Sequence, residues 1–150
     1  MLDWHFMGEA LLQARKAWSS KEVPVGVVVV HLKRIIARAY NQVEMLKDAT
    51  AHAEILAIRQ AENILGDWRL ADCILYVTKE PCSMCAGAIV QARLSQVVFG
   101  CADTRTGGAG GRLNLLQMPG WNHHCKIVSG VRAAECGRLL KKFFFKRRGC

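Results

Sequence analysis

Hydrophobic positions along the chain change their spacing several times, and each change predicts a new element of secondary structure. The first apolar positions recur in steps of three and four, at Trp4, Met7, Leu11, Ala14 and Trp18. This spacing predicts an amphipathic helix over 4–18, with Asp3 as its N-cap. Residues 23–30 are β-branched and almost continuously apolar, as in a strand that is covered on both faces. Residues 35–40 are its predicted antiparallel neighbour, and 41–50 are a polar loop.

Helices and strands alternate in the rest of the chain. The pattern predicts helices over 52–65, 82–93 and 131–148, strands over 73–78, 96–100 and 126–128, and a short helix at 113–116. Thr50 is the predicted cap of the first of these helices, and Gly66 closes it. This order predicts an α/β fold with a central mixed five-stranded sheet and helices on both faces. Ligands of such sheets bind beyond the carboxyl ends of strands, near helix starts.

The length of 150 residues fits one domain, spanning 1–150. The N-terminus lacks the pattern of a secretory signal, and no apolar run could cross a bilayer. We therefore expect a soluble, cytoplasmic protein without a membrane partner. Seven cysteines at scattered spacings do not fit a secreted disulfide framework. Five of them are interpreted as free thiols, mostly buried: Cys73, Cys101, Cys125, Cys136 and Cys150.

Positive charge is concentrated in the second half of the chain. The net charge is +9; residues 1–80 hold ten Lys/Arg and ten Asp/Glu, whereas 81–150 hold eleven Lys/Arg and two acidic residues. A basic surface on one part of a small domain indicates a polyanionic partner, most simply a nucleic acid. The same charge could also belong to a basic helix that contacts only solvent, and this alternative interpretation stays open.

Two short stretches carry the candidate chemistry. His52 and Glu54 lie in an H-x-E motif at a predicted helix start, and Cys82 and Cys85 lie in a P-C-x-x-C motif at another. Two thiols three residues apart lie on one face of a helix, and the positive end of the helix dipole favours their thiolates. One imidazole and two thiolates suit zinc and leave a fourth position for water. Glu54 can then move the protons of that water.

Other interpretations of these residues stay open. The close pair of cysteines could be a redox pair, although no thioredoxin-like pattern surrounds it. Cys73 or Cys101 could supply a fourth ligand and close the site into a structural zinc centre, which would leave Glu54 without a task.

Together, H-x-E and P-C-x-x-C form the signature of the zinc nucleoside deaminases. The segments 22–26, 48–54, 75–82, 84–88 and 119–123 also resemble the bacterial tRNA-specific adenosine deaminases of the cytidine/deoxycytidylate deaminase superfamily. The resemblance runs from Trp4 to about Arg148. It implies a cytidine-deaminase-like three-layer α/β/α fold, one Zn²⁺ per subunit and a homodimer. It also implies hydrolytic deamination of adenosine to inosine at the wobble position of an arginine tRNA, with the anticodon stem-loop as partner.

The resemblance assigns a role to each matching residue. It makes His52, Cys82 and Cys85 the zinc ligands and Glu54 the proton shuttle. It implies substrate contacts by Asn41, Val25 and Ala53 at the base, Asp103 at the neighbouring nucleotide, Arg105, Asn122 and His123 at the anticodon loop, and Phe143, Phe144, Arg147 and Arg148 along the nucleotide path. Purely structural roles stay open for several of these residues. Asn41 and Asp103 could be turn residues, Phe143 and Phe144 could belong to the hydrophobic core, and Arg147 and Arg148 could be a solvent-exposed end of the last helix.

Two other functions also stay open. One is a deaminase of free guanine or cytosine derivatives, which would not need the basic second half. The other is a non-catalytic RNA-binding module with a structural zinc, in which Glu54 would be dispensable.

Overall fold

The structure is a computed structural model that describes residues 2–148, without the side chain of Arg148. Its elements in chain order are α1 (Leu2–Ser19), β1 (Gly26–His31), β2 (Arg34–Tyr40), α2 (Val43–Leu46), α3 (Ala53–Leu65), β3 (Cys73–Lys79), α4 (Ser83–Gln91), β4 (Gln96–Cys101), the 3₁₀ helix η1 (Leu115–Gln117), β5 (Lys126–Val128) and α5 (Ala133–Arg148). The strands form one sheet in the order β2-β1-β3-β4-β5. Strands β2, β1 and β3 pair antiparallel, and β3, β4 and β5 pair parallel.

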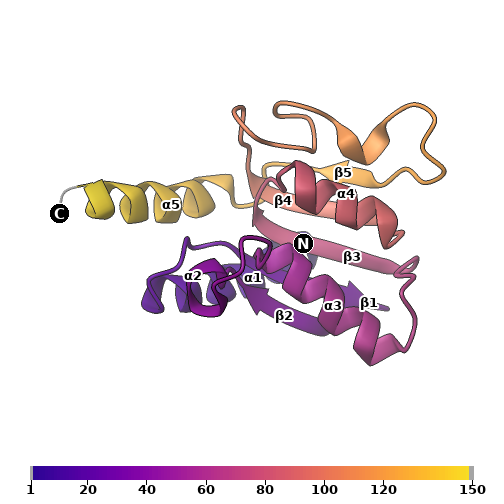
Figure 1. The fold of residues 1–150 in the computed structure, drawn as a ribbon, viewed down its shortest axis with the longest axis horizontal. Helices are drawn as coiled ribbons and strands as arrows, with labels where there is room; N and C mark the ends of the chain where they lie inside the picture. The colour runs from indigo at the N-terminus through magenta and orange to yellow at the C-terminus, as the bar shows by residue number, and fades with distance from the viewer. Residues whose placement is uncertain (1, 149–150) are drawn as a thin grey trace.

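Strand β1 shows how the two faces of the sheet are covered. Val27 and Val29 lie in the core cluster that includes residues of α3 and α4, whereas Val28 and Val30 lie in the cluster that includes residues of α1 and α5. All four side chains are at most 3% exposed. The predicted α/β fold, with a mixed sheet between two helical layers, is confirmed (Figure 1).

The candidate ligands lie at one end of this sheet because of its parallel half. The chain leaves β3 at Lys79, turns at Pro81 and enters α4, which returns it to the start of β4. The Glu80 amide donates to the carbonyl of Cys101 at 2.9 Å, so the ends of β3 and β4 stay paired. The start of α3 meets the start of α4 at this end, which is where ligands of such sheets bind.

Two predictions before α3 are wrong. The first strand begins at Gly26 and not at 23, because Pro24 has no N–H to donate to a sheet. The predicted loop 41–50 contains the single turn α2. The buried carboxylate of Glu22 accepts hydrogen bonds from the amides of Glu44 (3.1 Å) and Met45 (2.7 Å), and so caps this turn from a distant part of the chain.

Several helix boundaries also differ from the prediction. Helix α3 has His52 as its N-cap, because Thr50 is hydrogen-bonded to Asp48 instead. Asp3 lies inside α1, where its carboxylate accepts a 2.7 Å hydrogen bond from Tyr76. The short helix lies two residues further on, the helix predicted over 82–93 spans Ser83–Gln91, and α5 begins at Ala133. Gly66 closes α3 with φ 67°, as predicted.

Helix α5 leaves the body of the protein. It contacts β4 and β3, and its second half extends beyond the ends of the strands (Figure 1). The exposed fractions of Phe144 (38%) and Phe145 (80%) reflect this extension. None of the helices within residues 2–148 is long and apolar enough to cross a membrane.

Candidate active site

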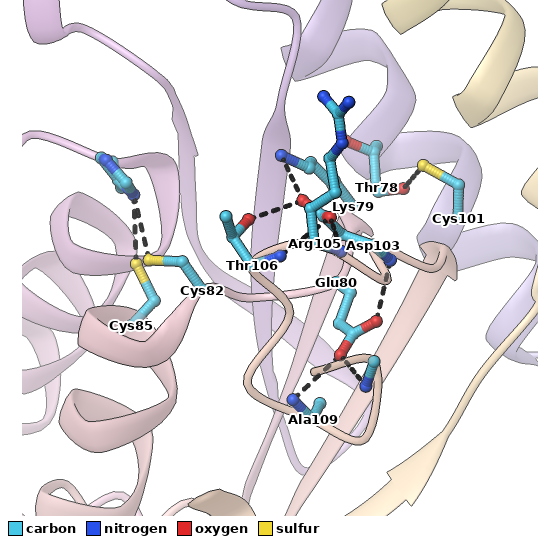
Figure 2. A network of polar contacts seen from close by, with 12 residues as sticks. Thr78, Lys79, Glu80, Cys82, Cys85, Cys101, Asp103, Arg105, Thr106 and Ala109 are labelled. Carbon is cyan, nitrogen blue, oxygen red and sulfur yellow. Dashed lines mark hydrogen bonds and ion pairs between the residues drawn. The ribbon is translucent and has the colours of Figure 1, made fainter. Parts of the chain in front are cut away.

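Two helix starts bring the three candidate ligands together. His52 is the N-cap of α3 and Cys82 the N-cap of α4, and both have extended backbone. The Nδ1 atom of His52 lies 3.6 Å from Sγ of Cys82 and 3.5 Å from Sγ of Cys85. Figure 2 shows the side chains of Cys82 and Cys85 next to each other at the start of α4. One ligand atom from each residue lies within 4.8 Å of the other two.

This donor set fits a zinc ion. One imidazole nitrogen and two sulfurs are ligands that Zn²⁺ takes in tetrahedral sites. Within residues 2–148, the cluster of potential ligands contains His52, Cys82 and Cys85 and neither Cys73 nor Cys101. The three residues could therefore bind a metal and leave a coordination position free, as catalytic zinc sites do.

The pKa values of the three candidate ligands are shifted in different directions. A hydrogen bond with the Cys85 thiol lowers the pKa of Cys82 to about 3. The same hydrogen bond, together with burial, raises the pKa of Cys85 well above its usual range. The hydrogen bond with Cys82 also raises the pKa of His52. The side chains thus already favour one thiolate beside the imidazole, and a bound cation would favour the second.

Glu54 is the second residue of α3 and is only 4% exposed. Burial raises the pKa of its carboxyl to about 7, while the His52 imidazole opposes this rise. The carboxyl also interacts with both thiols of the cluster. A carboxyl buried beside three atoms that could ligate a metal is suited to exchange protons with a molecule bound there.

A cavity of about 280 Å³ opens onto this cluster. His52, Glu54 and Cys82 line this cavity. Five of the residues expected to contact substrate line it as well: Val25, Asn41, Ala53, Phe144 and Arg147. The volume suits one flat heterocycle, because drug-sized ligand pockets start at roughly this size. Asn41 is 7% exposed, and its backbone amide donates to the carbonyl of Val25 at 3.1 Å.

Other expected substrate contacts lie outside this cavity wall. Arg105 and Asn122 are exposed, and His123 contacts the carbonyl of Leu94 through Nε2 at 2.6 Å, near the start of β4. Phe143 packs edge-on against Trp18, with ring centroids 5.8 Å apart. The side chain of Arg148 lies outside the described residues. The RNA-contacting roles of these residues stay predictions.

Asp103 caps a turn at the end of β4. Its carboxylate accepts hydrogen bonds from the amides of Arg105 (2.9 Å) and Thr106 (3.1 Å) and from the Thr106 hydroxyl (2.7 Å), and it pairs with Lys79 at 3.1 Å. Partial burial alone would raise the pKa of Asp103, but these contacts hold it well below its usual range. The turn-capping interpretation is therefore confirmed, and a substrate role would have to share the same carboxylate.

A buried carboxylate that sequence reasoning missed holds the Gly-rich loop beside the site. Glu80 is 3% exposed and accepts hydrogen bonds from the amides of Asp103 (2.9 Å), Ala109 (3.0 Å) and Gly111 (2.7 Å). Figure 2 shows this fan of contacts below the Asp103 turn. A Cβ at Gly107 would collide with the Glu80 carboxylate, so the loop needs glycine there. The cluster of glycines at 107–111 was the available signal of such a close approach.

Four of the remaining cysteines fit the expectation of free, mostly buried thiols. Burial raises the pKa to about 11 for Cys73 and to about 12 for Cys125 and Cys136, so these thiols stay protonated and unreactive. Cys101 is half-buried and contacts the carbonyl of Thr78. Cys150 lies outside the described residues.

Comparison with known proteins first defines the class. The family model described as MafB19-like deaminase matches residues 2–148, which cover the fold and every candidate ligand. The chain is 48% identical over 146 residues to the tRNA-specific adenosine deaminase of Bacillus subtilis (strain 168), covering 97% of this chain and 91% of the relative. A solved structure from studies of A-to-I editing by tRNA:A34 deaminases matches with a TM-score of 0.87 and 42% identity, covering 91% of this chain and 99% of that one. The chain belongs to the tRNA-specific adenosine deaminase family.

The fold is shared with deaminases of another kind. The structure of a guanine deaminase from Bacillus subtilis matches with a TM-score of 0.64 and 41% identity, covering 67% of this chain and 64% of that one. Fold alone therefore does not select the substrate.

Proposed function

We propose that this protein deaminates adenosine to inosine at the wobble position of a tRNA anticodon, using zinc held by His52, Cys82 and Cys85. The observation that carries the proposal is the shared cavity. Two of the three candidate ligands, His52 and Cys82, line the same space of about 280 Å³ as the buried residues Glu54 and Asn41. This space accepts one base, and a base can enter it only after leaving its stack.

The residues of this cavity divide the chemistry among themselves. His52, Cys82 and Cys85 would hold a zinc ion, and the bound ion would lower the pKa of a water molecule beside it. Glu54 takes a proton from that water and delivers it to the ring nitrogen next to the reacting carbon. The oxygen of that water would bond to the carbon that carries the exocyclic amine, and the carbon–nitrogen bond would then break. Glu54 passes the second proton to the departing amine, which leaves as ammonia, and the oxygen remains as the carbonyl of inosine.

Other residues of the wall bind and orient the base. Asn41 and the Ala53 amide are placed to hydrogen-bond the base edge, and Val25 supplies an apolar surface. Phe144 and Arg147, both from α5, also line the cavity. Unstacked RNA bases are commonly held by aromatic rings and guanidinium groups, so these two residues suit the strand on either side of the target.

The choice of tRNA over a free base rests on charge and on the relatives. Eleven Lys/Arg face two acidic residues in the second half of the chain, and the Bacillus subtilis relative is named for action on tRNA. We further propose that the substrate is an arginine tRNA, as the resemblance implies, and that the protein acts in the cytoplasm.

A homodimer with one zinc per subunit is also part of the proposal. It is supported by exposed apolar side chains on the helical layer that carries the ligands. Ile64 at the end of α3 is 66% exposed and Trp68 is 49% exposed. Exposed apolar side chains of this kind suit a contact with a second chain. Sedimentation at micromolar concentration should give twice the monomer mass; a monomer would contradict this part of the proposal.

The experiment that tests the function compares substrates. The zinc-loaded protein is incubated with an anticodon stem-loop that carries adenosine at the wobble position, with free adenosine, with guanine and with cytidine. We expect inosine in the stem-loop and little turnover of the free compounds. Faster turnover of guanine or cytidine would overturn the proposal in favour of a free-base deaminase.

A further inference from the structure

Arg132, directly before α5, links this helix to the first turns of α1. Its guanidinium donates two hydrogen bonds to the Glu135 carboxylate, from Nε at 2.9 Å and from Nη2 at 3.0 Å. The third nitrogen, Nη1, donates to the carbonyl of Trp4 at 3.3 Å. The guanidinium also lies over the Trp4 ring, 4.7 Å from its centroid. One side chain therefore joins two helices across 128 positions of the sequence.

Gly8 leaves the space in which this guanidinium lies. A Cβ on Gly8 would come within 2.5 Å of Nη1 of Arg132. Glycine in a helix interior is less stable than alanine, and Gly8 lies inside α1. The side chain of Arg132 is 20% exposed, held between the Glu135 carboxylate, the Trp4 ring and the backbone of Gly8. A solvent-exposed ion pair within one helix would stabilise little, whereas this guanidinium has a fitted seat on a second helix.

The direction of α5 depends on how its first turns are held. Cys136 and Leu139 pack in the core cluster that α5 shares with α1. A Cβ on Gly100 would come within 2.5 Å of Sγ of Cys136, so the helix lies directly on β4 there. Beyond the buried Leu140 the side chains of α5 are mostly exposed, and the helix extends beyond the ends of the strands (Figure 1). The contacts at its start therefore set where its second half lies.

A small rotation at the start of α5 would move the residues that line the catalytic cavity. Phe144 lies 12 residues beyond Arg132 and Arg147 lies 15 beyond it. At a rise of 1.5 Å per residue Phe144 is about 18 Å along the helix, so a tilt of about 5° displaces it by about 1.5 Å. A misplacement of about 1 Å is enough to weaken substrate positioning severely. The edge contact of Phe143 with Trp18 limits such a movement but leaves the start of the helix free to shift.

We propose that Arg132 is a positioning residue for the deamination of RNA. By tying the start of α5 to Trp4, it keeps Phe144 and Arg147 at the cavity. Arg132 does not itself line that cavity, so it acts through these two residues. The inference rests on the proposed function, since it concerns how the same site keeps its wall in place. It adds a residue to which the resemblance assigns no role.

The first test compares Arg132→Ala with Arg138→Ala, a matched control that removes an exposed arginine from the same helix. Zinc-loaded proteins are used throughout. Binding of a fluorescent anticodon stem-loop is measured in a Glu54→Ala background, and kcat and KM for inosine formation are measured with Glu54 present. We expect Arg132→Ala to weaken binding and to raise KM by about fivefold, the lower end of the value of one stacked base, with kcat nearly unchanged. Arg138→Ala should stay close to the parent, and equal effects of the two substitutions would overturn the proposal.

Gly8→Ala separates positioning from stability. The added methyl group displaces the flexible guanidinium of Arg132, while the gain in helix propensity offsets the lost contacts. The melting temperature should therefore stay close to that of the parent, and RNA binding should weaken as it does with Arg132→Ala. In an Arg132→Ala background, Gly8→Ala should have no further effect on binding. A Gly8→Ala variant that binds RNA as the parent does would overturn the positioning role.

A double-mutant cycle identifies the residues through which Arg132 acts. Phe144→Ala combined with Arg132→Ala should weaken RNA binding by less than the product of the two single effects, because a misplaced ring has less contact to lose. The same should hold for Arg147→Ala. Fully independent effects in both cycles would overturn the proposal. Wild-type protein that shows this coupling in RNA binding but forms no inosine would contradict the proposed function and leave the positioning role intact.

Discussion

Replacing Glu80 by glutamine tests how the Gly-rich loop is held against the site. In the native structure one carboxylate oxygen accepts the amide of Asp103, and the other accepts the amides of Ala109 and Gly111. A glutamine has only one acceptor oxygen. Its best orientation keeps the two contacts to Ala109 and Gly111 and points its NH₂ group at the Asp103 amide, so that two donors face each other.

The loss of stability caused by Glu80→Gln can be estimated from the hydrogen bonds that change. One hydrogen bond to a buried charged group is lost, at about 1.5–3 kcal/mol, and a buried amide is left unsatisfied, at about 1–3 kcal/mol. The two remaining bonds also lose the charge of their acceptor. We expect a loss of about 3 kcal/mol in the free energy of unfolding. For a chain of this size the melting temperature then falls by about 6–12 °C.

Calorimetry and hydrogen exchange measure the two parts of this prediction. Calorimetry gives the change in stability, and exchange should accelerate at the amides of Asp103, Ala109 and Gly111 more than in the sheet. Glu9→Gln is the control: it makes the same chemical change in an exposed ion pair with Arg38 and should cost less than about 1 kcal/mol. Equal stability losses for the two variants, or unchanged protection of the three amides, would refute the argument that Glu80 holds the loop.

Three further predictions concern the metal cluster, the glycines and the RNA. Cys85→Ser should lower the zinc content measured by atomic emission to well below one per chain, whereas Cys101→Ser should retain it; zinc in both variants would remove Cys85 from the ligand set. Gly107→Ala should destabilise the protein in urea unfolding by at least about 2 kcal/mol, because a Cβ there meets the Glu80 carboxylate. Gly87→Ala, in an open position of α4, should stabilise it by about 0.5–1 kcal/mol, and similar effects at both sites would contradict the steric argument. Stem-loop binding should weaken with salt with a slope of about −2 or steeper, as for three phosphate contacts; salt-insensitive binding would argue against the basic surface.

The sheet, its helical layers and the ligand cluster could be predicted because their signals are local. Apolar spacing along β1 shows that both its faces are buried, and Cys82 and Cys85 stand at a spacing that suits one helix face. The expected packing of two neighbouring helix starts predicts that His52 lies beside these two thiols. Each of these inferences needs only nearby residues and general rules of packing.

Residues whose partners lie far along the chain could not be predicted in this way. Glu22 and Glu80 look like ordinary surface acids in the sequence, yet each is buried against amides at least 22 residues away. The turn α2 exists because of one of these contacts. The three phenylalanines of α5 are likewise divided by tertiary structure: Phe143 packs on Trp18, Phe144 lines the cavity and Phe145 faces solvent. Periodicity alone cannot make this division, because it depends on where α5 leaves the sheet.

The central claim is that Glu54, beside a zinc ion held by His52, Cys82 and Cys85, deaminates adenosine in tRNA. The most direct measurement is sequencing for inosine in tRNA incubated with the pure wild-type protein and with Glu54→Ala, both with measured zinc content and RNA affinity. We predict inosine at the wobble position with wild type. With Glu54→Ala we predict a rate lower by about 10²–10⁴ with zinc and RNA binding retained. Undiminished inosine formation by the zinc-loaded variant, or none by the zinc-loaded wild type, would contradict the account.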